Sequence, residues 1–295
     1  MAQSDWRIGM VGLGALGLPI AINLQKAGLN LQVHTRSRRA ENEPELSGAW
    51  PCKNPAATAE NVDVLLLCVS DDSAVKNVLF GQDGAAEQLQ PGSIVVDCST
   101  ISPKAAQQVA AQLGQIGVHY LDAPVTGGTE GARAGALTVL VGGDAAVLAK
   151  VRPILDVIGG SIHYIGPVGR GQQAKAVNQV LVAGNYAAVA EALALGQRLN
   201  LPMQQVIEAL KRGAAGSWAL DHRSEAMLQG KYPLGFKLSL HHKDLGIALE
   251  TANRVELDMP ITALVEQLET DLIQQGYGND DVSALHRWNA ARGKA

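Results

Sequence analysis

The sequence predicts an α/β fold, with a doubly wound and mostly parallel sheet in the first part of the chain and an all-helical domain in the second. A glycine-rich turn separates an apolar segment from a helix-forming segment within residues 7–28. Short apolar runs then alternate with helix-forming segments over roughly the first 165 residues, a pattern typical of βα units. After Gly171 the alternation ends and helix-forming residues dominate. We therefore predict a sheet domain at residues 1–166 and a helical domain at residues 167–295.

The segment RIGMVGLGALGLPIAINLQKAG, residues 7–28, has the order of a Rossmann-type nucleotide-binding unit. Residues 8–11 predict a buried parallel strand, Pro19 suits the first turn of a helix, and residues 31–34 predict the second strand. The glycines follow the G-x-G-x-x-G pattern, in which the backbone and a helix N-terminus approach a dinucleotide pyrophosphate. The alternative is a glycine-rich turn that binds nothing. We predict that six residues of the turn contact the cofactor: Gly12, Leu13, Gly14, Ala15, Leu16 and Gly17.

The residues after the second predicted strand indicate which nicotinamide cofactor binds. NAD-preferring sites place an Asp or Glu there, about 20 residues beyond the glycines, to hydrogen-bond the ribose 2′-hydroxyl. This chain reads LQVHTRSRRA from Leu31, without an acid, and we expect Thr35, Arg36 and Ser37 to contact the cofactor. Hydroxyls and guanidinium groups suit a 2′-phosphate, so we predict NADP(H) in preference to NAD(H). The alternative is a solvated basic loop.

Four further apolar runs predict the remaining strands of the sheet. They are residues 62–69, 93–98, 118–122 and 137–142. In a doubly wound sheet, ligands bind at the carboxyl ends of the strands. We therefore expect Cys68 and Val69, at the end of the first of these runs, to border the cofactor, with Ser99 and Thr100 following the second.

The composition of the chain excludes several functional classes. Its 295 residues suffice for two domains, and the net charge of −4, the aromatic content of 4% and the absence of a long basic run predict no nucleic-acid partner. The beginning of the chain does not resemble a signal peptide, and no run of 18 apolar residues occurs. We therefore predict a cytoplasmic protein with no membrane partner.

The cysteines and histidines do not form a metal or disulfide pattern. Cys52, Cys68 and Cys98 are odd in number and widely spaced, which favours small core residues. His241 and His242 are adjacent, and neighbours on a helix point about 100° apart, so they do not form a metal site together. We predict no metal.

The segment QQAKAVNQVLVAGNYAAVAEALALGQRLN, residues 172–200, predicts one long helix because it contains no proline and many helix formers. Such a helix spans roughly 45 Å, more than a small domain needs. We expect it to join the two domains and to pack against a partner subunit in a homodimer or homotetramer.

Two segments carry candidate chemistry. In DAPVTGG, residues 122–128, the Thr126 hydroxyl and the backbone N–H groups of Gly127 and Gly128 could hold a carboxylate, or the segment is a plain turn with a helix cap. In GRGQQAKAVNQ, residues 169–179, Lys175 shares one helix face with Asn178 and Gln179. A lysine near a helix N-terminus opposes the helix dipole, although solvated helix lysines are common.

With these motifs in place, the chain resembles the β-hydroxyacid dehydrogenases, a family that includes 3-hydroxyisobutyrate dehydrogenases, tartronate semialdehyde reductases and glyoxylate/succinic semialdehyde reductases. The resemblance extends over nearly the whole chain. The motifs are GLGALGLPIAINLQKAG, DCSTISP, DAPVTGGTEGARAGALTVLVGG, GRGQQAKAVNQ and GFKLSLHHKDLGIALE. The chain departs from the family pattern at Leu16, where Met is usual, at Thr126, where Ser is usual, and at Gln179, where many members carry Asn.

The resemblance implies a mechanism in which NADPH reduces the carbonyl of a small aldehyde acid and Lys175 protonates the developing alkoxide. By the same resemblance, Thr126, Gly127 and Gly128 would bind the substrate carboxylate, and Asn178 or Gln179 would orient substrate and lysine. Matching motif positions imply two further cofactor contacts, Thr100 and Lys243, and two residues that close the substrate site from the helical domain, Phe236 and Asp244.

The family does not by itself select a substrate. Glyoxylate, succinic semialdehyde, tartronate semialdehyde and methylmalonate semialdehyde all remain candidates, because one methylene in a pocket changes discrimination by only about 1–3 kcal/mol. One alternative is an imine reductase on the same scaffold, although imine reductases generally lack this lysine. A 6-phosphogluconate-type dehydrogenase would be longer and would carry more cationic phosphate ligands. A non-catalytic NADP-binding module is the remaining alternative.

Overall fold

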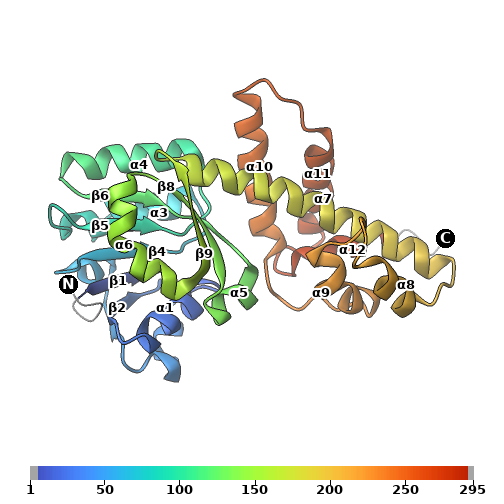
Figure 1. The fold of residues 1–295 in the computed structure, drawn as a ribbon, viewed down its shortest axis with the longest axis horizontal. Helices are drawn as coiled ribbons and strands as arrows, with labels where there is room; N and C mark the ends of the chain where they lie inside the picture. Colours follow the sequence, from blue (N-terminus) through green and yellow to red (C-terminus); the bar gives the residue numbers. More distant parts are fainter. Residues whose placement is uncertain (1–5, 292–295) are drawn as a thin grey trace. The chain divides into compact units, whose positions relative to one another are not determined.

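The computed structural model describes residues 6–291, and the chain divides into two compact units, Met1–Lys175 and Ala176–Ala295. Figure 1 shows a sheet flanked by helices in the first unit. The described part of the second unit is built from helices and the turns between them. This arrangement confirms the predicted fold class.

The described part of the first unit contains one nine-stranded sheet with the order β3-β2-β1-β4-β5-β6-β8-β7, and β9 pairs with β8. The strands are β1 Arg7–Val11, β2 Asn30–His34, β3 Trp50–Pro51, β4 Val64–Leu67, β5 Ile94–Asp97, β6 His119–Asp122, β7 Val125–Thr126, β8 Leu137–Gly142 and β9 Gly159–Gly166. All pairs from β3 to β6 are parallel, whereas β8 is antiparallel to β6 and β7 and parallel to β9. The sheet is therefore doubly wound and mostly parallel, as predicted.

Buried apolar runs explain which strands could be predicted. In β4 all four residues, Val64–Leu67, are buried, which is the pattern of a central strand covered on both faces. The strands β3 and β7 were not predicted because two residues are too few to show a pattern. The strand β9 was also missed, because most of its residues are exposed or half-buried and it lacks an apolar run.

Helices cover both faces of the sheet. The helices of the first unit are α1 Gly17–Lys26, α2 Pro55–Ala59, α3 Asp72–Phe80, α4 Pro103–Gln115, α5 Gly128–Ala134 and α6 Ala145–Ile158, with short 3₁₀ turns η2 Ala40–Asn42, η3 Pro44–Leu46 and η4 Ala85–Glu87. On one face, side chains of α1, α5 and α6 pack with Leu66 and Val96. On the other face, α2, α3 and α4 pack with Leu65 and Val95. Successive residues of a strand thus pack into the apolar cores on opposite faces of the sheet.

The second unit has its own apolar core. Its helices are α7 Arg170–Arg198, which begins in the first unit, α8 Met203–Leu210, α9 Trp218–Leu228, α10 Leu238–Asn253, α11 Pro260–Gln274, η5 Val282–Leu285 and α12 His286–Ala291. Side chains of α7, α9, α10, α11 and η5 form this core. The helices α10 and α11 are also joined by polar pairs, His241 Nδ1 to Glu269 Oε1 at 2.6 Å and His242 Nε2 to Glu266 Oε1 at 2.8 Å.

The helix α7 contains 29 residues and starts two residues before the predicted segment. Among the described residues it is the one helix that is long and apolar enough to cross a membrane, with a mean hydropathy of 1.2 over an 18-residue window. Core helices of soluble proteins meet the same criterion, and 44% of that window is buried inside the protein. The criterion therefore gives weak support for a membrane span.

Candidate active site

The glycine-rich turn follows β1 at the place where the chain changes direction in the sheet. The strand β1 lies between β2 and β4. The chain passes from β1 to β2 on one side and later continues at β4 on the other side, so the strand order reverses at the carboxyl end of β1. The Gly12 N–H donates to the His34 carbonyl at 2.9 Å, and the Cys68 N–H donates to the Val11 carbonyl at 3.0 Å. Ligands of doubly wound sheets bind at such a switch point.

Two of the three motif glycines are enclosed by backbone. Gly12 has a φ of +99°, and a Cβ there would lie 2.2 Å from the Cys68 carbonyl oxygen. At Gly17 a Cβ would lie 1.9 Å from the Gly12 carbonyl oxygen. These positions require glycine for the turn and for close packing of α1.

Gly14 differs from Gly12 and Gly17, because a Cβ there would meet nothing within 4 Å. Gly14 and Ala15 are exposed, and Leu16 at the start of α1 provides no side-chain cap to the helix N–H groups. The first turn of α1 also contains no acid. Open space at Gly14, the lack of a side-chain cap and the positive end of the helix dipole fit a dinucleotide pyrophosphate.

The basic loop after β2 is more structured than the sequence indicated. Glu41 lies with its side chain 3% exposed, accepts from the Thr35 N–H at 2.7 Å and pairs with Arg38 Nη2 at 3.0 Å. An acid therefore does lie at the end of β2. This acid is not evident from the sequence because the turn at η2 brings it back from six residues beyond Thr35. Both Glu41 oxygens are engaged by protein groups.

Arg36 and Ser37 take no part in the hydrogen bonds described for this cluster. Both residues are exposed, and within residues 6–291 the Arg36 guanidinium forms no hydrogen bond or ion pair. Arg38 instead donates to the Cys52 carbonyl and lies 3.2 Å from His34 Nδ1. Of these two arginines, Arg36 is the one available to a ligand.

The ends of β4 and β5 are tied together beside the glycine-rich turn. The Val69 N–H donates to Ser99 Oγ at 2.9 Å, which connects the two predicted cofactor segments at Val69 and Thr100. The Ser99 N–H donates in turn to Asp97 Oδ1 at 2.9 Å. Burial raises the pKa of Asp97 to about 6 and that of the Cys68 thiol to about 12, so Cys68 stays neutral at this edge.

The predicted carboxylate loop has backbone that only glycine adopts readily. Thr126 is the last residue of β7, and Gly127 and Gly128 follow with φ values of +129° and +63°. Gly127 precedes α5 and provides no side-chain cap. Two consecutive glycines at a helix start leave backbone N–H groups and the half-buried Thr126 hydroxyl for an anion.

Lys175 lies near the start of α7 and is only 7% exposed, so it is not a solvated surface lysine. The first turn of this helix is bound to the sheet. The buried Asp122 carboxylate, at the end of β6, accepts from the Gly169 N–H at 2.7 Å and from the Gln172 N–H at 2.9 Å. Lys175 is therefore held on the same unit that carries the glycine-rich turn.

The other predicted polar residues lie in the helical unit, where they form a chain of contacts. Asn178 Nδ2 donates to Gln179 Oε1 at 2.7 Å, and Gln179 Nε2 donates to Asp244 Oδ2 at 2.7 Å. Lys243 Nζ pairs with Asp244 Oδ1 at 2.9 Å. Gln179 is 1% exposed and its amide is engaged at both ends, whereas Asn178 is half-buried. Gln179 therefore orients its neighbours, and Asn178 is the amide with greater access.

Phe236 is half-buried just before α10 and contacts His241 edge to face, with ring centroids 5.6 Å apart. The His241 ring is held in turn by Glu269 on α11. The position of Phe236 in the helical unit is thus fixed by aromatic packing on the buried, hydrogen-bonded His241 ring.

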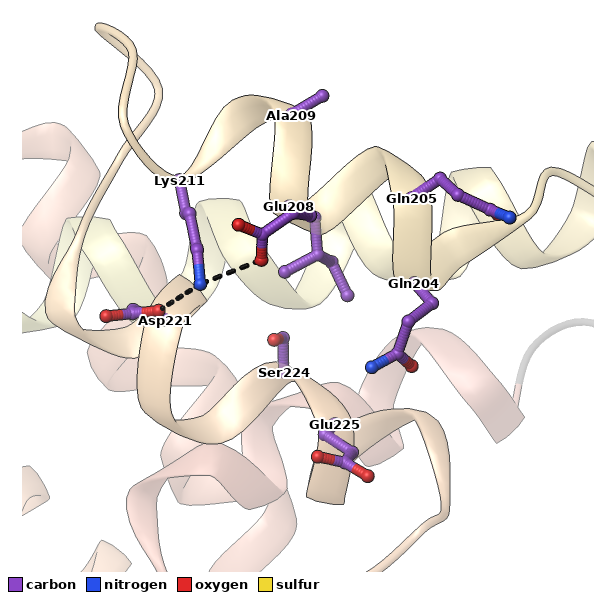
Figure 2. A pocket seen from close by; sticks show the side chains of 9 residues that line it. Gln204, Gln205, Glu208, Ala209, Lys211, Asp221, Ser224 and Glu225 are labelled. Carbon is purple, nitrogen blue, oxygen red and sulfur yellow. Dashed lines mark ion pairs between the residues drawn. The ribbon is translucent and has the colours of Figure 1, made fainter.

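A separate pocket of about 620 Å³ lies between α8 and α9. Figure 2 shows Lys211 in it, paired with Glu208 at 2.8 Å and Asp221 at 3.3 Å. Hydrogen bonds to Glu208 and Asp221 raise the pKa of Lys211, which makes it a poor general acid near neutral pH. None of the predicted site residues lines this pocket.

No cluster of three His, Cys, Asp or Glu side chains that could hold a metal occurs within residues 6–291. His241 and His242 instead bind carboxylates of α11.

Comparison with known proteins relates both units to dehydrogenases. Residues 7–166 match the NAD binding domain of 6-phosphogluconate dehydrogenase, and residues 169–289 match a domain described as NAD-binding of NADP-dependent 3-hydroxyisobutyrate dehydrogenase. The chain is 38% identical over 279 residues to 2-hydroxy-3-oxopropionate reductase of Escherichia coli, covering 95% of each chain.

Two solved structures have a similar fold over nearly their whole length. A crystal structure of 3-hydroxyisobutyrate dehydrogenase from Salmonella typhimurium has a TM-score of 0.88 and 31% identity, covering 96% of this chain and 100% of that one. A complex of Psf3 with NADP+ and 2-OPP has a TM-score of 0.88 and 27% identity, covering 95% and 99%.

The fold, the glycine-rich turn and these matches define a two-domain NAD(P)-dependent oxidoreductase. More narrowly, the chain belongs to the β-hydroxyacid dehydrogenase family, whose named members include dehydrogenases and reductases of small hydroxyacids.

Proposed function

We propose that this protein is an NADPH-dependent reductase of a small semialdehyde or oxoacid, which it converts to the hydroxyacid with Lys175 as general acid. The observation that carries the proposal is the burial of Lys175 on a helix start that is hydrogen-bonded to the sheet. A lysine that is 7% exposed beside a nucleotide-binding edge differs from an ordinary solvated helix lysine, and buried titratable groups cluster at functional sites.

Bound NADPH supplies the hydride that reduces the carbonyl carbon. Lys175 donates a proton from Nζ to the carbonyl oxygen as negative charge develops there, and its positive charge stabilises that oxygen beforehand. In the oxidation direction, neutral Lys175 accepts the hydroxyl proton. Thr126 and the N–H groups of Gly127 and Gly128 bind the substrate carboxylate, which fixes the carbonyl relative to the lysine.

The helical unit contributes the remaining residues of the proposal. Asn178 lies three residues after Lys175 on α7, on the same helix face, and is the amide we assign to the substrate. Gln179 orients Asn178 through the bond between their side chains. Phe236 and Asp244 as substrate residues, and Lys243 as a cofactor residue, stay predictions.

Among the substrate candidates, the similarity to 2-hydroxy-3-oxopropionate reductase favours tartronate semialdehyde, which is the same compound. The test is NADPH consumption by the purified protein with tartronate semialdehyde, methylmalonate semialdehyde, succinic semialdehyde and glyoxylate. We expect turnover of at least one of the four. NADPH binding without turnover of any compound would contradict the proposed reaction and favour an imine substrate or a non-catalytic role.

We assign the preference for NADPH to Arg36. Its exposed guanidinium would meet a 2′-phosphate, whereas Arg38 is held by Glu41. We expect Arg36→Ala to raise the Michaelis constant for NADPH by about 10-fold to 100-fold, because a hydrogen bond to a charged group contributes about 1.5–3 kcal/mol. The Michaelis constant for NADH should change by less than about 2-fold, since NADH has no 2′-phosphate.

A control for the loss of surface charge is Arg152→Ala, which removes an exposed arginine of α6 that pairs with Asp156. It should leave both constants unchanged. A wild-type preference for NADH, or equal effects of Arg36→Ala on the two cofactors, would contradict the assignment.

We further propose a homodimer or homotetramer in which the exposed face of α7 meets a second copy. Leu181 and Leu195 are 64% and 61% exposed, and exposed Ala188 lies midway between them at heptad spacing. The mass in solution, measured by light scattering, tests this association. The cytoplasmic location stays a prediction.

A further inference from the structure

The start of α7 is capped by a carboxylate from another element. Asp122 is fully buried at the end of β6, and its two oxygens accept from the backbone N–H groups of Gly169 and Gln172. Helix N-termini are usually capped by a side chain of the preceding residue. Here the cap ties the helix to the sheet, so the position of the first turn is determined by β6.

Two glycines make room for this carboxylate. A Cβ at Gly142 would lie 2.5 Å from Asp122 Oδ1, and a Cβ at Gly171 would lie 2.4 Å from the Leu140 carbonyl oxygen and 2.8 Å from Asp122 Oδ2. Neither glycine has a φ in the left-handed region, so close approach is the reason for glycine at both positions. The helix start is therefore packed directly against β8 and the end of β6.

Gln172 ties the same turn to the segment around Thr100. Its side-chain Nε2 donates to the Ser99 carbonyl at 2.8 Å, and its Oε1 accepts from the Ile101 N–H at 3.1 Å. The side chain is 1% exposed. One amide thus binds the backbone on both sides of Thr100, and it does so from a position three residues before Lys175 on the helix.

We propose that Gln172, supported by the Asp122 cap, is a positioning residue that fixes Lys175 relative to the Thr100 segment. The inference rests on the proposed function, in which Lys175 transfers a proton and Thr100 contacts the cofactor. Residues three apart on a helix share a face, so a shift of Gln172 moves Lys175 with it. A misplacement of about 1 Å at a reacting group lowers rates by about 10²-fold.

The competing explanation is that Gln172 only stabilises the fold. A purely stabilising residue would lower the fraction of folded enzyme and would leave the chemistry of each folded molecule unchanged. Positioning instead changes the rate constant of every molecule.

The variant that separates the two explanations is Gln172→Met, which keeps the length of the side chain and removes both hydrogen bonds. Its matched control is Gln173→Met, because within residues 6–291 the side chain of the neighbouring Gln173 bonds only to the exposed Arg170, accepting from Nη1 at 2.9 Å. A second variant, Asp122→Asn, replaces the carboxylate by an amide. The amide has only one oxygen to accept from the N–H groups of Gly169 and Gln172.

The first measurement is hydrogen–deuterium exchange of the protein without cofactor. In Gln172→Met we expect faster exchange at residues 99–101 and 169–175, since the Ile101 N–H has lost its acceptor, with other segments unchanged. Asp122→Asn should act on residues 169–175, and Gln173→Met should match the wild type. Unchanged exchange at residues 99–101 in Gln172→Met would overturn the proposal.

The second measurement is a single turnover of enzyme-bound NADPH with saturating tartronate semialdehyde as the probe. Positioning predicts that Gln172→Met lowers the rate constant by about 30-fold to 100-fold at an amplitude close to that of the wild type. A lower amplitude with an unchanged rate constant would overturn the proposal and assign Gln172 a stabilising role. If the proposed function itself were wrong, the result would differ, because Lys175→Ala would then be fully active.

Discussion

Lys175→Ala is expected to lower kcat by about 10²-fold to 10⁴-fold, the usual contribution of a positioned general acid. The dissociation constant for NADPH should change by less than about 3-fold, because this lysine is assigned to the substrate oxygen and the cofactor is bound elsewhere. Steady-state turnover and a fluorescence titration of NADPH measure the two quantities.

Lys175→Arg separates proton transfer from electrostatics. A guanidinium keeps the positive charge but does not release a proton near neutral pH, and its planar fork is larger than an ammonium. We therefore expect this variant to be nearly as inactive as the alanine variant. Lys150→Ala, which removes an exposed lysine of α6, is the control and should be fully active. More than about a tenth of wild-type turnover in Lys175→Ala would contradict the role of general acid.

The sequence predicted the parts of the fold that depend on local patterns. Residues 64–67 are apolar and buried on both faces, and G-x-G-x-x-G stands between a strand and a helix, so each could be identified from its own segment. The antiparallel β8 and the exposed β9 depend on pairing between distant segments. Their own residues carry little information about that pairing.

In the candidate site, too, local motifs identified some residues, whereas contacts between distant segments could not be predicted. Lys175 and the carboxylate loop were identified from motifs, but the contacts that hold them were not. Glu41 reaches the end of β2 through a turn, and Gln172 reaches Ser99 across 73 residues of chain. Gln172 stood in a segment already singled out and Glu41 directly follows one, yet no local pattern distinguishes a buried polar side chain from a solvated one.

Enzymes of this fold bind the cofactor pyrophosphate at a glycine-rich turn, and its glycines have separable roles in this chain. Gly17→Ala is expected to destabilise the protein by at least about 3 kcal/mol, because a Cβ there would lie 1.9 Å from the Gly12 carbonyl oxygen. For a unit of this size, that corresponds to a fall in Tm of about 6–12 °C. Calorimetry without cofactor measures it.

Gly14→Ala is expected to leave the stability of the protein unchanged and to weaken NADPH binding. Its Cβ would meet nothing within 4 Å, so the Tm of the cofactor-free protein should remain within about 2 °C of the wild type. The methyl group would occupy the space in which the backbone approaches the pyrophosphate, and we expect NADPH to bind at least about 10-fold more weakly.

The control for adding a methyl group is Gly114→Ala within α4, where a Cβ would also meet nothing within 4 Å. Alanine favours a helix over glycine by about 1 kcal/mol, so this variant should bind NADPH normally and melt no lower than the wild type. If Gly14→Ala bound NADPH as tightly as Gly114→Ala, the pyrophosphate would not lie against Gly14. If Gly17→Ala melted at the wild-type temperature, the close packing of α1 on the turn would be wrong.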